Sequence, residues 1–461
     1  MKKRKLLPET ARQNVTEAQN AAYAATLKQM VDCKTVWTDN NDNKDAYEQF
    51  YQVVADSFPT LHSTAKRLTF GAGCFFYVVE GPNAAKNVLL MSHHDVVDGS
   101  EGWDTDPFCA VEKDGYLYGR GTIDTKTPLF AELQAAEELL LQGYDFAGIN
   151  LYIGSSHNEE VGGDGMVLAV EYFKQQGIRF DVIVDEGGAI TSGMIPGVSA
   201  KSAMVAVHEK SRHHYRCTAK QNDSGHTGLS PNDDSMVSRM ASFMTEVNRA
   251  NIYRGKFHPE VRATFEYHAP YMAFPMNVLF GNLTLFSPII KKIMVGIPQT
   301  KAMLSTACTF TSLFAGKPEH PTFRAQTAQA NLSLRCIRED DLYAGLEKIK
   351  KIAEKYGVEI EEVERDYCQP TDFRARPYQL LEDVLNENFP DVIVAPFLLT
   401  AGTDARRFTD IADSILRFAP IDLNKQQFAS IHNKNEHISI QNIGQCVLFY
   451  KALIQKLAKN Q

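Results

Sequence analysis

The sequence lacks several features that would place it in a specialised class of protein. Its eight cysteines are scattered without a Cys-x-x-Cys pair, which is typical of reduced thiols rather than of a disulfide framework. Basic residues are not in excess, because 48 Lys and Arg stand against 56 Asp and Glu and give a net charge of -8. No nucleic-acid partner is therefore expected, since phosphate-backbone binders normally present a basic face. Internal repeats and low-complexity tracts are also absent.

Signals for export and for a membrane span are missing as well. The basic cluster at residues 2–5 is followed by no apolar segment of the kind found in signal peptides, so the expected compartment is cytoplasmic. Residues 269–290 carry no charged side chain, but proline, glycine and asparagine interrupt the apolar run of about 20 residues that a transmembrane helix needs. We expect no membrane span there, but a segment that is buried or forms an interface.

What is present is the composition of a large, mildly acidic globular protein. The chain has 461 residues, of which 44% are hydrophobic and 23% charged. A domain size of about 150 residues allows three domains. Between residues 85 and 190, short apolar runs alternate with helical stretches, a pattern typical of β-α-β units in a sheet with a parallel core. We predict strands at residues 87–91, 150–154 and 180–184, a hairpin at 111–118, and helices at 128–141 and 164–176.

The pattern changes near residue 200 and returns near residue 370. In between, the sequence predicts strands at residues 204–207, 215–219 and 330–335 and a helix at 236–250, which indicate a separate α+β unit. The predicted fold class is therefore α/β. It comprises a mixed sheet with a parallel core and flanking helices, encoded by residues 1–200 and 367–461, and an inserted α+β domain at residues 201–366.

Histidine or carboxylate side chains follow four predicted strands of the first segment. Sheets with a parallel core bind ligands at the carboxyl ends of their strands, so these side chains are expected at one site. A single acidic residue at a strand end is more often structural, but four in succession are difficult to explain as helix caps or turns. The four strand ends are Ser92-His93-His94-Asp95, residues 119–126 with Asp124, His157-Asn158-Glu159-Glu160, and Asp185-Glu186-Gly187-Gly188.

Carboxylates that converge without Lys or Arg between them would repel one another, so a cation is expected among them. Imidazole and carboxylate ligands suit zinc, manganese or cobalt, and two ions about 3.5–4 Å apart are a standard hydrolytic arrangement. In His93-x-Asp95, the carboxylate is expected to accept the second imidazole N–H and so orient the ring. The adjacent Glu159 and Glu160 fit a division in which one binds metal and the other takes a proton from water.

These side chains belong to a longer ordered series of motifs. The series comprises His93-His94-Asp95-Val96-Val97, Trp103-Asp104-Thr105-Asp106-Pro107-Phe108, Gly115-Tyr116-Leu117-Tyr118-Gly119-Arg120-Gly121 with Asp124, Glu159-Glu160-Val161-Gly162-Gly163, Val184-Asp185-Glu186-Gly187-Gly188, residues 277–290, and Gly402-Thr403-Asp404-Ala405-Arg406. The combination closely resembles the co-catalytic zinc exopeptidase superfamily of aminoacylase, carboxypeptidase G and succinyl-diaminopimelate desuccinylase. Within it, the chain most resembles the carboxypeptidase S and N-acyl-amino-acid hydrolase branch, and the match covers residues 85–440.

The resemblance implies a zinc exopeptidase-like catalytic domain that holds two Zn²⁺ ions per subunit, for which Co²⁺ or Mn²⁺ can substitute. The implied ligands are His93 for one ion, Asp124 as the bridge between both, Glu160 for the second ion, and His432 as the last member of the set. Relatives place either Asp or Glu after the fourth strand. Asp185 and Glu186 are therefore both candidate ligands, with Asp185 slightly favoured.

The resemblance also assigns supporting roles around the metal ligands. Glu159 would act as the general base, and Asp95 would support the catalytic site. His94 and His437 are expected to be packed or solvated neighbours rather than ligands. Thr125 stands where many relatives have a second Asp after the bridging one.

The inserted domain resembles the lid of this superfamily, which commonly forms a homodimer. His226 corresponds to the lid histidine that reaches a substrate oxygen, often across the dimer, and Arg335 to the arginine that clamps a substrate carboxylate. Gly402 and Arg406 belong to a loop expected to line the carboxylate pocket. The chain departs from its relatives at residues 322–325, where they carry an Asn-Val-Ile/Leu-Pro turn whose asparagine helps to hold substrate.

The implied activity is hydrolysis of an amide bond next to a free carboxylate. One substrate class is a small peptide, cleaved by a carboxypeptidase or dipeptidase, and the other is an N-acyl, including fatty-acyl, amino acid. The apolar stretch at residues 269–290 modestly favours a hydrophobic acyl group, although it fits a dimer interface equally well. A hypothesis of a different class is a catalytically silent metal-binding protein, which the intact Glu159 argues against.

Overall fold

The larger sheet of the protein has parallel strands at its centre and antiparallel pairs on both sides of them. The computed structural model describes residues 3–38, 43–193, 195–222, 226–229, 235–317, 319 and 322–459. In this part of the chain, the 10-stranded sheet has the order β1-β2-β6-β3-β7-β15-β9-β8-β16, with β14 paired to β9. Strands β6, β3, β7 and β15 are mutually parallel, which confirms the predicted mixed sheet with a parallel core.

Four of the ten strands of this sheet, β3, β6, β7 and β9, lie where the sequence predicts strands, and the other six were not predicted. The strands are β1 (Lys66–Phe70), β2 (Cys74–Glu80), β3 (Lys86–Met91), β6 (Ile149–Ser155), β7 (Val182–Asp185), β8 (Ile190–Thr191), β9 (Ser202–Glu209), β14 (Ile393–Leu399), β15 (Ile415–Arg417) and β16 (Asp422–Leu423). A separate three-stranded sheet contains the predicted hairpin, with the strands β4 (Val111–Lys113), β5 (Tyr116–Tyr118) and β17 (His437–Ser439).

Helices cover both faces of the larger sheet, as the alternation of buried side chains requires. In β3, Val88 and Leu90 belong to a core cluster shared with one set of helices, whereas Leu89 and Met91 belong to a second cluster on the opposite face. Because successive strand residues point to opposite faces, one buried run of residues serves both layers. The first set is α1 (Glu17–Asp32), α2 (Lys44–Ser57), α3 (Pro59–Thr64), α4 (Lys126–Leu141), α12 (Arg376–Asn388) and α14 (Ile440–Lys459). The second face carries α5 (Gly165–Gln175) and η4 (Asp404–Phe408).

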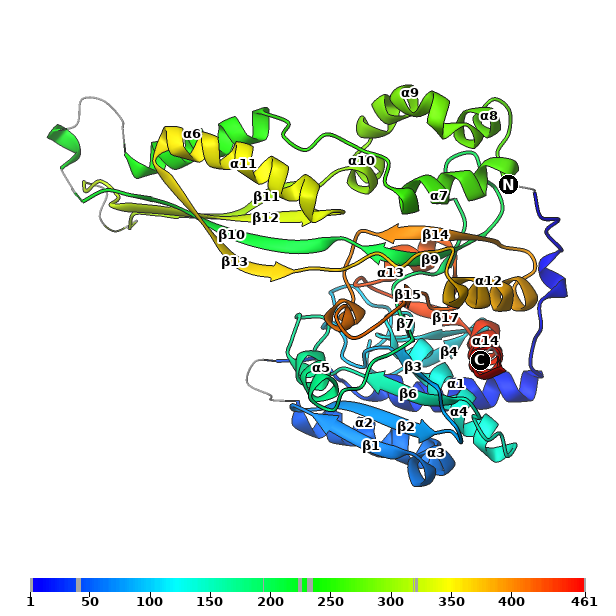
Figure 1. Cartoon of the computed structure of the whole chain (residues 1–461). Helices are drawn as coiled ribbons and strands as arrows, with labels where there is room; N and C mark the ends of the chain where they lie inside the picture. The colour runs from blue at the N-terminus through cyan, green and yellow to red at the C-terminus, as the bar shows by residue number, and fades with distance from the viewer. Residues whose placement is uncertain are drawn as a thin grey trace.

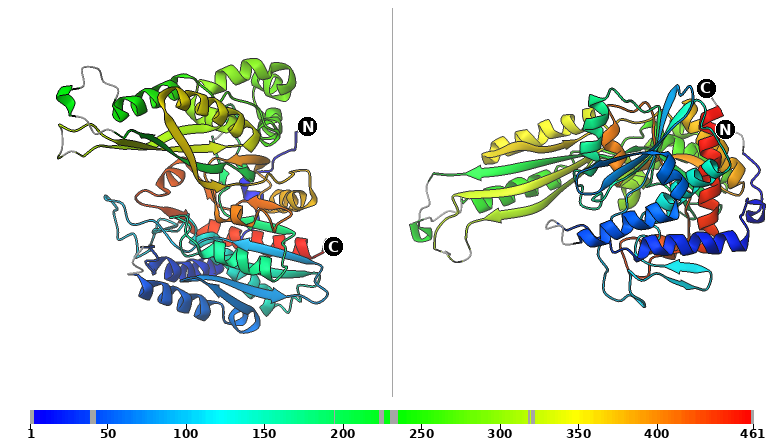
Figure 2. Two further views of the ribbon diagram at one scale, coloured as in Figure 1. Left: turned by 60° about the vertical axis from the view of Figure 1, so that its left-hand side comes forward. Right: turned by 90° about the horizontal axis from the view of Figure 1, so that it is seen from below.

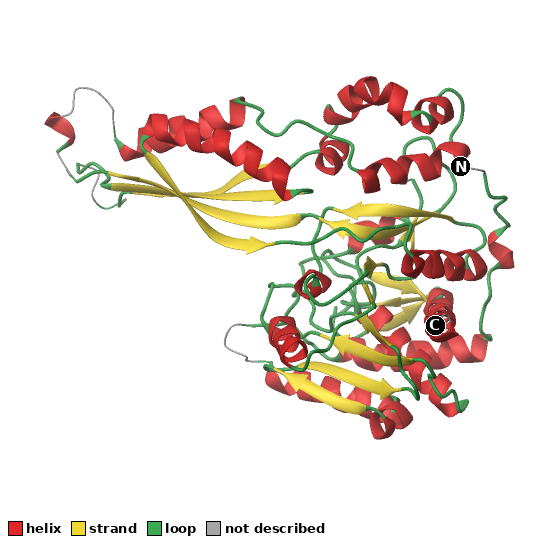
Figure 3. Ribbon diagram, viewed as in Figure 1, coloured by secondary structure: helices red, strands yellow, loops and turns green. Residues whose placement is uncertain are grey.

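A lid domain projects from this main domain as a long arm (Figure 1, Figure 2). Its four-stranded antiparallel sheet has the order β11-β12-β10-β13, and its two helices lie along one face only (Figure 3). The elements are β10 (Ser211–Lys220), η2 (Thr227–Leu229), α6 (Met236–Arg249), β11 (Ala307–Ala315), β12 (Thr327–Cys336), α11 (Glu339–Tyr356) and β13 (Val358–Asp366). Helix α11 ends at Gly357, whose φ of 62° only glycine adopts without strain.

The boundary of the lid differs from the predicted one at its beginning. Strand β9, which the sequence assigned to the inserted segment, pairs in parallel with β14 and carries only buried side chains. It therefore belongs to the main domain, and the lid sheet begins at Ser211 rather than at residue 201. The prediction was wrong here because a buried apolar strand does not reveal by its own sequence which sheet it will join.

The inserted segment also contributes a helical cluster that is separate from the lid sheet. Its elements are α7 (Pro259–His268), η3 (Ala269–Tyr271), α8 (Met276–Gly281), α9 (Leu283–Val295) and α10 (Pro298–Leu304). Helix α7 packs on β14, and the shared core contains Val261, Phe265 and Leu398. In the described part of the chain, every helix falls short of the combination of length and hydropathy that crossing a bilayer requires.

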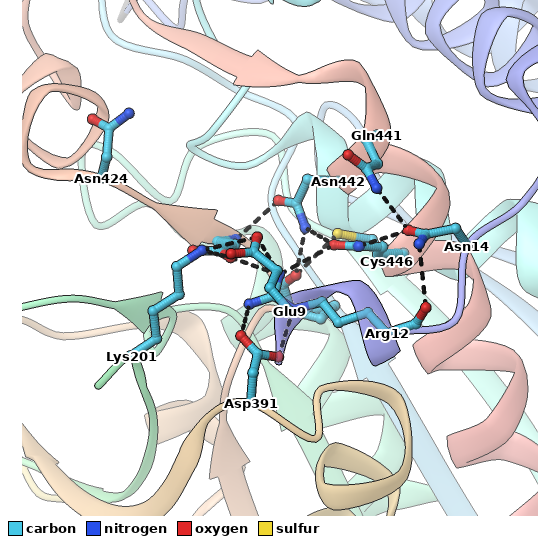
Figure 4. Close-up of polar contacts among 12 residues, drawn as sticks. Glu9, Arg12, Asn14, Lys201, Asp391, Asn424, Gln441, Asn442 and Cys446 are labelled. Carbon is cyan, nitrogen blue, oxygen red and sulfur yellow. Dashed lines mark hydrogen bonds and ion pairs between the residues drawn. The ribbon is translucent and has the colours of Figure 1, made fainter. Parts of the chain in front are cut away.

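An N-terminal strap ties these parts of the molecule together. It comprises residues 3–16 and includes η1 (Glu9–Ala11); α1 follows it, capped by Thr16, whose side chain accepts from the amide of Gln19. The guanidinium of Arg12 donates to both oxygens of Asp391 at 2.7 and 2.6 Å and to Asp422 at 2.6 Å (Figure 4). Arg12 is only 5% exposed, so the strap is held by a buried, charge-assisted contact.

Replacing Arg12 by methionine is expected to destabilise the main domain by about 3 kcal/mol, because Asp391 would be left nearly buried without its partner and Asp422 would keep only Lys201, at 2.7 Å. The measurement is equilibrium unfolding in urea followed by circular dichroism. The matched control is Lys174→Met, which removes an exposed pair with Asp410 and should cost less than about 1 kcal/mol. Equal effects of the two substitutions would contradict the assigned role of Arg12.

Candidate metal centre

The predicted site residues converge at the carboxyl edge of the parallel strands. His93 follows β3, Glu159 and Glu160 follow β6, and Glu186 follows β7. Asp124 precedes α4, and His432 comes from the loop between α13 (Lys425–Ser430) and β17. The C-terminal segment thus supplies a histidine to a cluster whose other members come from the first 190 residues.

Asp124 lies between two imidazole rings, and each of its oxygens faces a different one. Its Oδ1 is 3.1 Å from Nε2 of His93, and its Oδ2 is 3.0 Å from Nε2 of His432. Glu160 approaches Nε2 of His432 at 3.1 Å. His93, Asp124 and Glu160 each offer one ligand atom, and these atoms lie within 4.8 Å of one another. A carboxylate in this position can offer one oxygen as a ligand beside His93 and the other as a ligand beside His432.

Asp95 organises the site in a different way from the predicted one. Nδ1 of His93 lies 2.9 Å from the backbone oxygen of Asp95 and 3.4 Å from its carboxylate. The carboxylate instead accepts the backbone amides of Glu159 and Glu160, at 3.1 and 3.0 Å. The backbone of Asp95 therefore orients the His93 ring, while its side chain fixes the turn that presents the two glutamates.

Glu436 is a positioning residue to which the sequence assigned no role. It is fully buried, and its carboxylate accepts the amides of Ile123 and Asp124 at 2.7 and 3.1 Å and the guanidinium of Arg120 at 2.8 Å. These bonds fix the backbone that carries Asp124. The only sequence signal was its place four residues after His432, in the segment Ile431-His432-Asn433-Lys434-Asn435-Glu436.

Glu159 and Glu186 have carboxylates without a protein partner. Neither side chain forms a hydrogen bond or an ion pair with the described residues, and both line the same cavity as Asp124. Burial, together with the neighbouring carboxylates, raises the pKa of Glu159 and of Glu186 well above the usual range. Both side chains thus face the cavity without a cationic partner among the described residues, and this environment favours their protonated forms.

Asp185 is satisfied by backbone amides, unlike its neighbour Glu186. Its two oxygens accept the amides of Glu186 and Ala405, both at 2.9 Å, and it does not line the cavity. Burial and the nearby Asp404 raise the pKa of Asp185 to about 7. Of the two candidates that the sequence left open, the geometry therefore favours Glu186 as the group that faces a metal, although the sequence slightly favoured Asp185.

The cluster fits a bound divalent cation in its donors and in its charge. Imidazole nitrogens and carboxylate oxygens are the ligands that zinc and similar ions accept. Hydrogen bonds to Asp124 and Glu160 raise the pKa of His432 to about 10, which indicates that these carboxylates attract positive charge. Cations held here would supply the positive charge that is missing beside the carboxylates of Glu159 and Glu186.

The other histidines and Thr125 are held by packing and hydrogen bonds. His94 is buried, hydrogen-bonds Ser155 at 2.8 Å and stacks on Phe50, and burial lowers its pKa well below the usual value. His437 stacks on Tyr118 with ring centroids 4.6 Å apart. Thr125 donates its hydroxyl to the backbone oxygen of His93 at 3.3 Å.

Gly402 and Arg406 occupy different sides of one loop. Gly402 lines the cavity, whereas Arg406 is 7% exposed and lies behind the loop, with its Nε 3.2 Å from Asp366. A Cβ on Gly402 would lie 2.0 Å from the Arg406 guanidinium, so only glycine leaves this guanidinium in its present position against the loop. Arg406 therefore supports the cavity loop and connects it to the end of the lid sheet, and it does not line the cavity.

The lid residues lie apart from the metal centre. His226 is exposed and directly precedes η2, which lies at the far end of the lid arm (Figure 1); it forms a β-bridge with Phe323, and the centroids of the two rings are 6.4 Å apart. Phe323 belongs to the segment that replaces the expected Asn-Val-x-Pro turn. Arg335 lies on the face of the lid sheet that carries no helices, directly opposite Arg212 in the register, and does not line the cavity.

The cavity beside the cluster has a volume of about 380 Å³ and a largely apolar wall. Its polar end contains the metal-centre residues. Its apolar wall is formed by side chains from both chain segments, among them Pro128, Met204, Phe397, Leu399, Ile421, Leu423 and Phe428. The sequence did not single out these residues, because as isolated apolar positions they are indistinguishable from core.

Replacing Glu436 by glutamine is expected to weaken zinc binding about 10- to 100-fold, because one oxygen of Glu436 accepts both backbone N–H groups and the other accepts Arg120, and a glutamine that kept the amides would turn its own NH2 group toward that buried guanidinium. The measurement is competition with a zinc-binding dye, together with circular dichroism as a check of the fold. Glu112→Gln, on the exposed hairpin, is the matched control. Unchanged zinc affinity of the Glu436 variant would rule out its positioning role.

Comparisons with known proteins agree with this site. Residues 89–456 match the family described as Peptidase family M20/M25/M40. The chain is 30% identical to mouse (Mus musculus) N-fatty-acyl-amino acid synthase/hydrolase PM20D1 over 453 residues, 95% of this chain and 88% of the mouse protein. It is 28% identical to the probable carboxypeptidase S-like 2 of Dictyostelium discoideum, over 98% of this chain and 86% of that protein.

A solved structure supports the same conclusion for the fold. The crystal structure of Sso-CP2, an M20 family metallo-carboxypeptidase from Sulfolobus solfataricus, superposes with a TM-score of 0.68 at 16% identity, covering 95% of this chain and 99% of that one. The family is metal-dependent, and the family match spans every strand that carries the cluster. The chain therefore belongs to peptidase family M20/M25/M40 and is a hydrolase of that family.

Proposed function

We propose that the protein is a dinuclear zinc hydrolase that cleaves the amide bond of N-acyl amino acids with apolar, including fatty, acyl groups. The observation that carries this proposal is the opening of the metal centre onto a cavity of about 380 Å³ whose wall is mostly apolar. An apolar acyl chain would fill that wall, while the amide would lie against the metal centre. The similarity to the mouse N-fatty-acyl-amino acid synthase/hydrolase supports the same substrate class.

Two ions would be held by the residues that surround Asp124. His93 would bind one ion and Asp124 would bridge both, because its two oxygens already face different imidazoles. Glu160 and His432 would complete one site and Glu186 the other. Bound zinc, or Co²⁺ or Mn²⁺ in its place, supplies Lewis acidity that polarises a carbonyl oxygen and acidifies water.

Glu159 would perform the proton transfers. Its carboxylate faces the cavity without a hydrogen-bond partner among the described residues, and the turn that carries it is fixed by Asp95. A raised pKa suits a group that first accepts a proton from water and then returns it to the leaving amine. The water oxygen forms the new bond to the carbonyl carbon, and the C–N bond breaks.

Arg335 is the candidate receptor for the free carboxylate of the substrate. It faces Arg212 across the lid sheet, and such a pair of like charges is unfavourable unless an anion lies between or beside them. Arg212 pairs with Glu364 at 2.8 Å, whereas Arg335 has no hydrogen bond or ion pair with the described residues. Movement of the lid toward the main domain would bring this guanidinium to the substrate.

The position of His226 at the far end of the arm fits action on a second subunit. Within one chain, η2, which directly follows His226, lies at the end of the arm away from the main domain (Figure 1), so a contact of His226 with substrate would require a homodimer in which two lids cross. The exposed edge strand β11 offers a surface for such a contact. Sedimentation velocity of the full chain tests the dimer directly.

A second candidate function is a carboxypeptidase or dipeptidase on small peptides. It is favoured by the carboxypeptidase S-like relative and by the fold shared with the metallo-carboxypeptidase Sso-CP2. Both functions use the same centre and the same carboxylate receptor. They differ in what occupies the apolar wall, so comparison of N-acyl amino acids with dipeptides separates them.

Glu159→Gln is expected to retain both metals and to lose about 10²- to 10⁴-fold in kcat, because glutamine cannot accept the proton. Turnover of an N-acyl amino acid and the zinc content by mass spectrometry measure the two effects. The control is Glu101→Gln, an exposed surface change. Near-normal turnover of the Glu159 variant would exclude this residue as the base, and absence of turnover in the zinc-loaded natural protein would favour a silent metal-binding role.

Phe428→Ala is expected to lower kcat/KM for long-chain acyl substrates about ten-fold, equivalent to about 1.4 kcal/mol, since Phe428 lies at the cavity and is 47% exposed. The same variant should leave N-acetyl substrates almost unchanged, because an acetyl group does not reach this ring. A series of acyl lengths provides the measurement. An equal loss for short and long chains would show that the wall does not bind the acyl group.

A further inference from the structure

The helical cluster exposes an apolar surface that the proposed reaction does not use. Among the described residues, 19 large hydrophobic side chains are exposed, and six of them lie within 24 residues of sequence. We call these six the apolar face: Phe274, Val278, Leu285, Ile289, Ile293 and Ile297. Phe274 is 82% exposed and Leu285 74%, so nothing in the described part of the chain covers them. Contiguous exposure on this scale marks a surface that meets an apolar partner.

Helix α9 is apolar on both of its sides. Leu283, Ile290 and Met294 are buried against the cluster core, as expected for a surface helix. The opposite side carries Leu285, Ile289 and Ile293, whose spacing of four residues places them in one row along the helix. A surface helix normally buries its single apolar stripe, but α9, which also carries Lys291 and Lys292, has a second stripe that needs an apolar environment of its own. The folded chain supplies that environment on one side only.

The charges around the apolar face are basic, in contrast to the acidic protein as a whole. No Asp or Glu occurs between residues 267 and 316, whereas Lys291, Lys292 and Lys301 do. All three lysines are exposed. The N-terminal strap adds Lys3, whose ammonium group lies 5.5 Å from the ring centre of Tyr271 in η3. A basic rim beside an apolar surface is complementary to anionic lipid.

The size and position of these helices suit the surface of a bilayer. At about 1.5 Å per residue, the 13 residues of α9 extend for about 20 Å, which is shorter than a hydrocarbon core of about 30 Å. Helices α8 and α9 lie at an outer corner of the molecule in Figure 1 and in the left view of Figure 2. They can therefore enter a bilayer surface side-on without obstruction by the larger sheet.

We propose that the apolar face of α8 and α9, with its lysine rim, docks the protein on the surface of an anionic lipid bilayer. The six apolar side chains enter the boundary between head groups and acyl chains, and the lysines remain among the lipid phosphates. Docking of this kind is reversible and does not require a membrane span. It goes beyond the proposed hydrolysis and does not depend on it, because an inactive protein would bind in the same way.

The test is co-sedimentation of the full chain with vesicles in the absence of substrate. Vesicles of phosphatidylcholine alone are compared with vesicles that also contain phosphatidylglycerol, at low and at high salt. The natural chain should bind the mixed vesicles more tightly, and high salt should weaken that preference because it screens the lysines. Absence of binding to both vesicles, or equal binding that is insensitive to salt, would overturn the proposal.

Two sets of substitutions localise the binding surface. Leu285→Gln, Ile289→Gln and Ile293→Gln together should weaken binding to the mixed vesicles about ten-fold or more, since three inserted side chains are lost. The matched control combines Leu141→Gln, Val167→Gln and Val363→Gln, which are also exposed but lie elsewhere. It should change binding less than two-fold. An equal loss in the two triple variants would overturn the proposal.

Charge reversal and sedimentation separate the remaining alternatives. Lys291→Glu with Lys292→Glu should weaken binding to the mixed vesicles while leaving binding to phosphatidylcholine nearly unchanged. If the apolar face instead joined two copies of the chain, the glutamine triple variant would dissociate an oligomer in sedimentation velocity, and the natural chain would not bind vesicles. That result would replace the bilayer by a second copy as the occupant.

Discussion

Crowding of negative charge at the carboxyl edge of the sheet is the constraint around which the main domain is arranged. The carboxylates of Asp95, Asp124, Glu159, Glu160 and Glu186 converge there. The fold answers their repulsion in two ways. Backbone amides satisfy Asp95, and the imidazoles of two distant chain segments approach Asp124 and Glu160. Among the described residues, Glu159 and Glu186 have no hydrogen-bond or ion-pair partner, which leaves room for cations and for a base.

The need to bring His432 and Glu436 to Asp124 explains why the main domain is built from two chain segments. The carboxylate of Glu436 accepts two backbone amides just before α4, so a residue near the end of the chain fixes the geometry of the loop that carries Asp124. The inserted residues are tied to the same region. Glu209, at the end of β9, accepts the amide of Thr403 and the guanidinium of Arg417, and Arg406 reaches Asp366 at the end of the lid sheet. The cavity loop and both lid connections thus share one buried network.

The helical cluster lies on the other side of the cavity wall. Met204 and Phe397 line the cavity and also pack in the core beneath α7 and α9. The cluster therefore serves two purposes with its two sides. Its inner side supports the apolar wall beside the metal centre, and its outer side presents the apolar face with the lysine rim. An enzyme acting on acylated substrates would gain from both, because such substrates partition into lipid.

The sequence by itself determined the α/β class and the strand-end residues of the cluster, because strand periodicity and chemistry at strand ends are local properties, while His432 was expected only from the family resemblance. Tertiary structure decided the rest. In the folded chain β9 pairs within the larger sheet. The carboxylate of Asp185 accepts backbone amides while Glu186 faces the cavity, and Arg406 lies behind its loop. Tertiary structure also put His226 at the far end of the lid and brought Glu436 beneath Asp124. These outcomes depend on which groups meet across hundreds of residues, and only the folded chain fixes those partners.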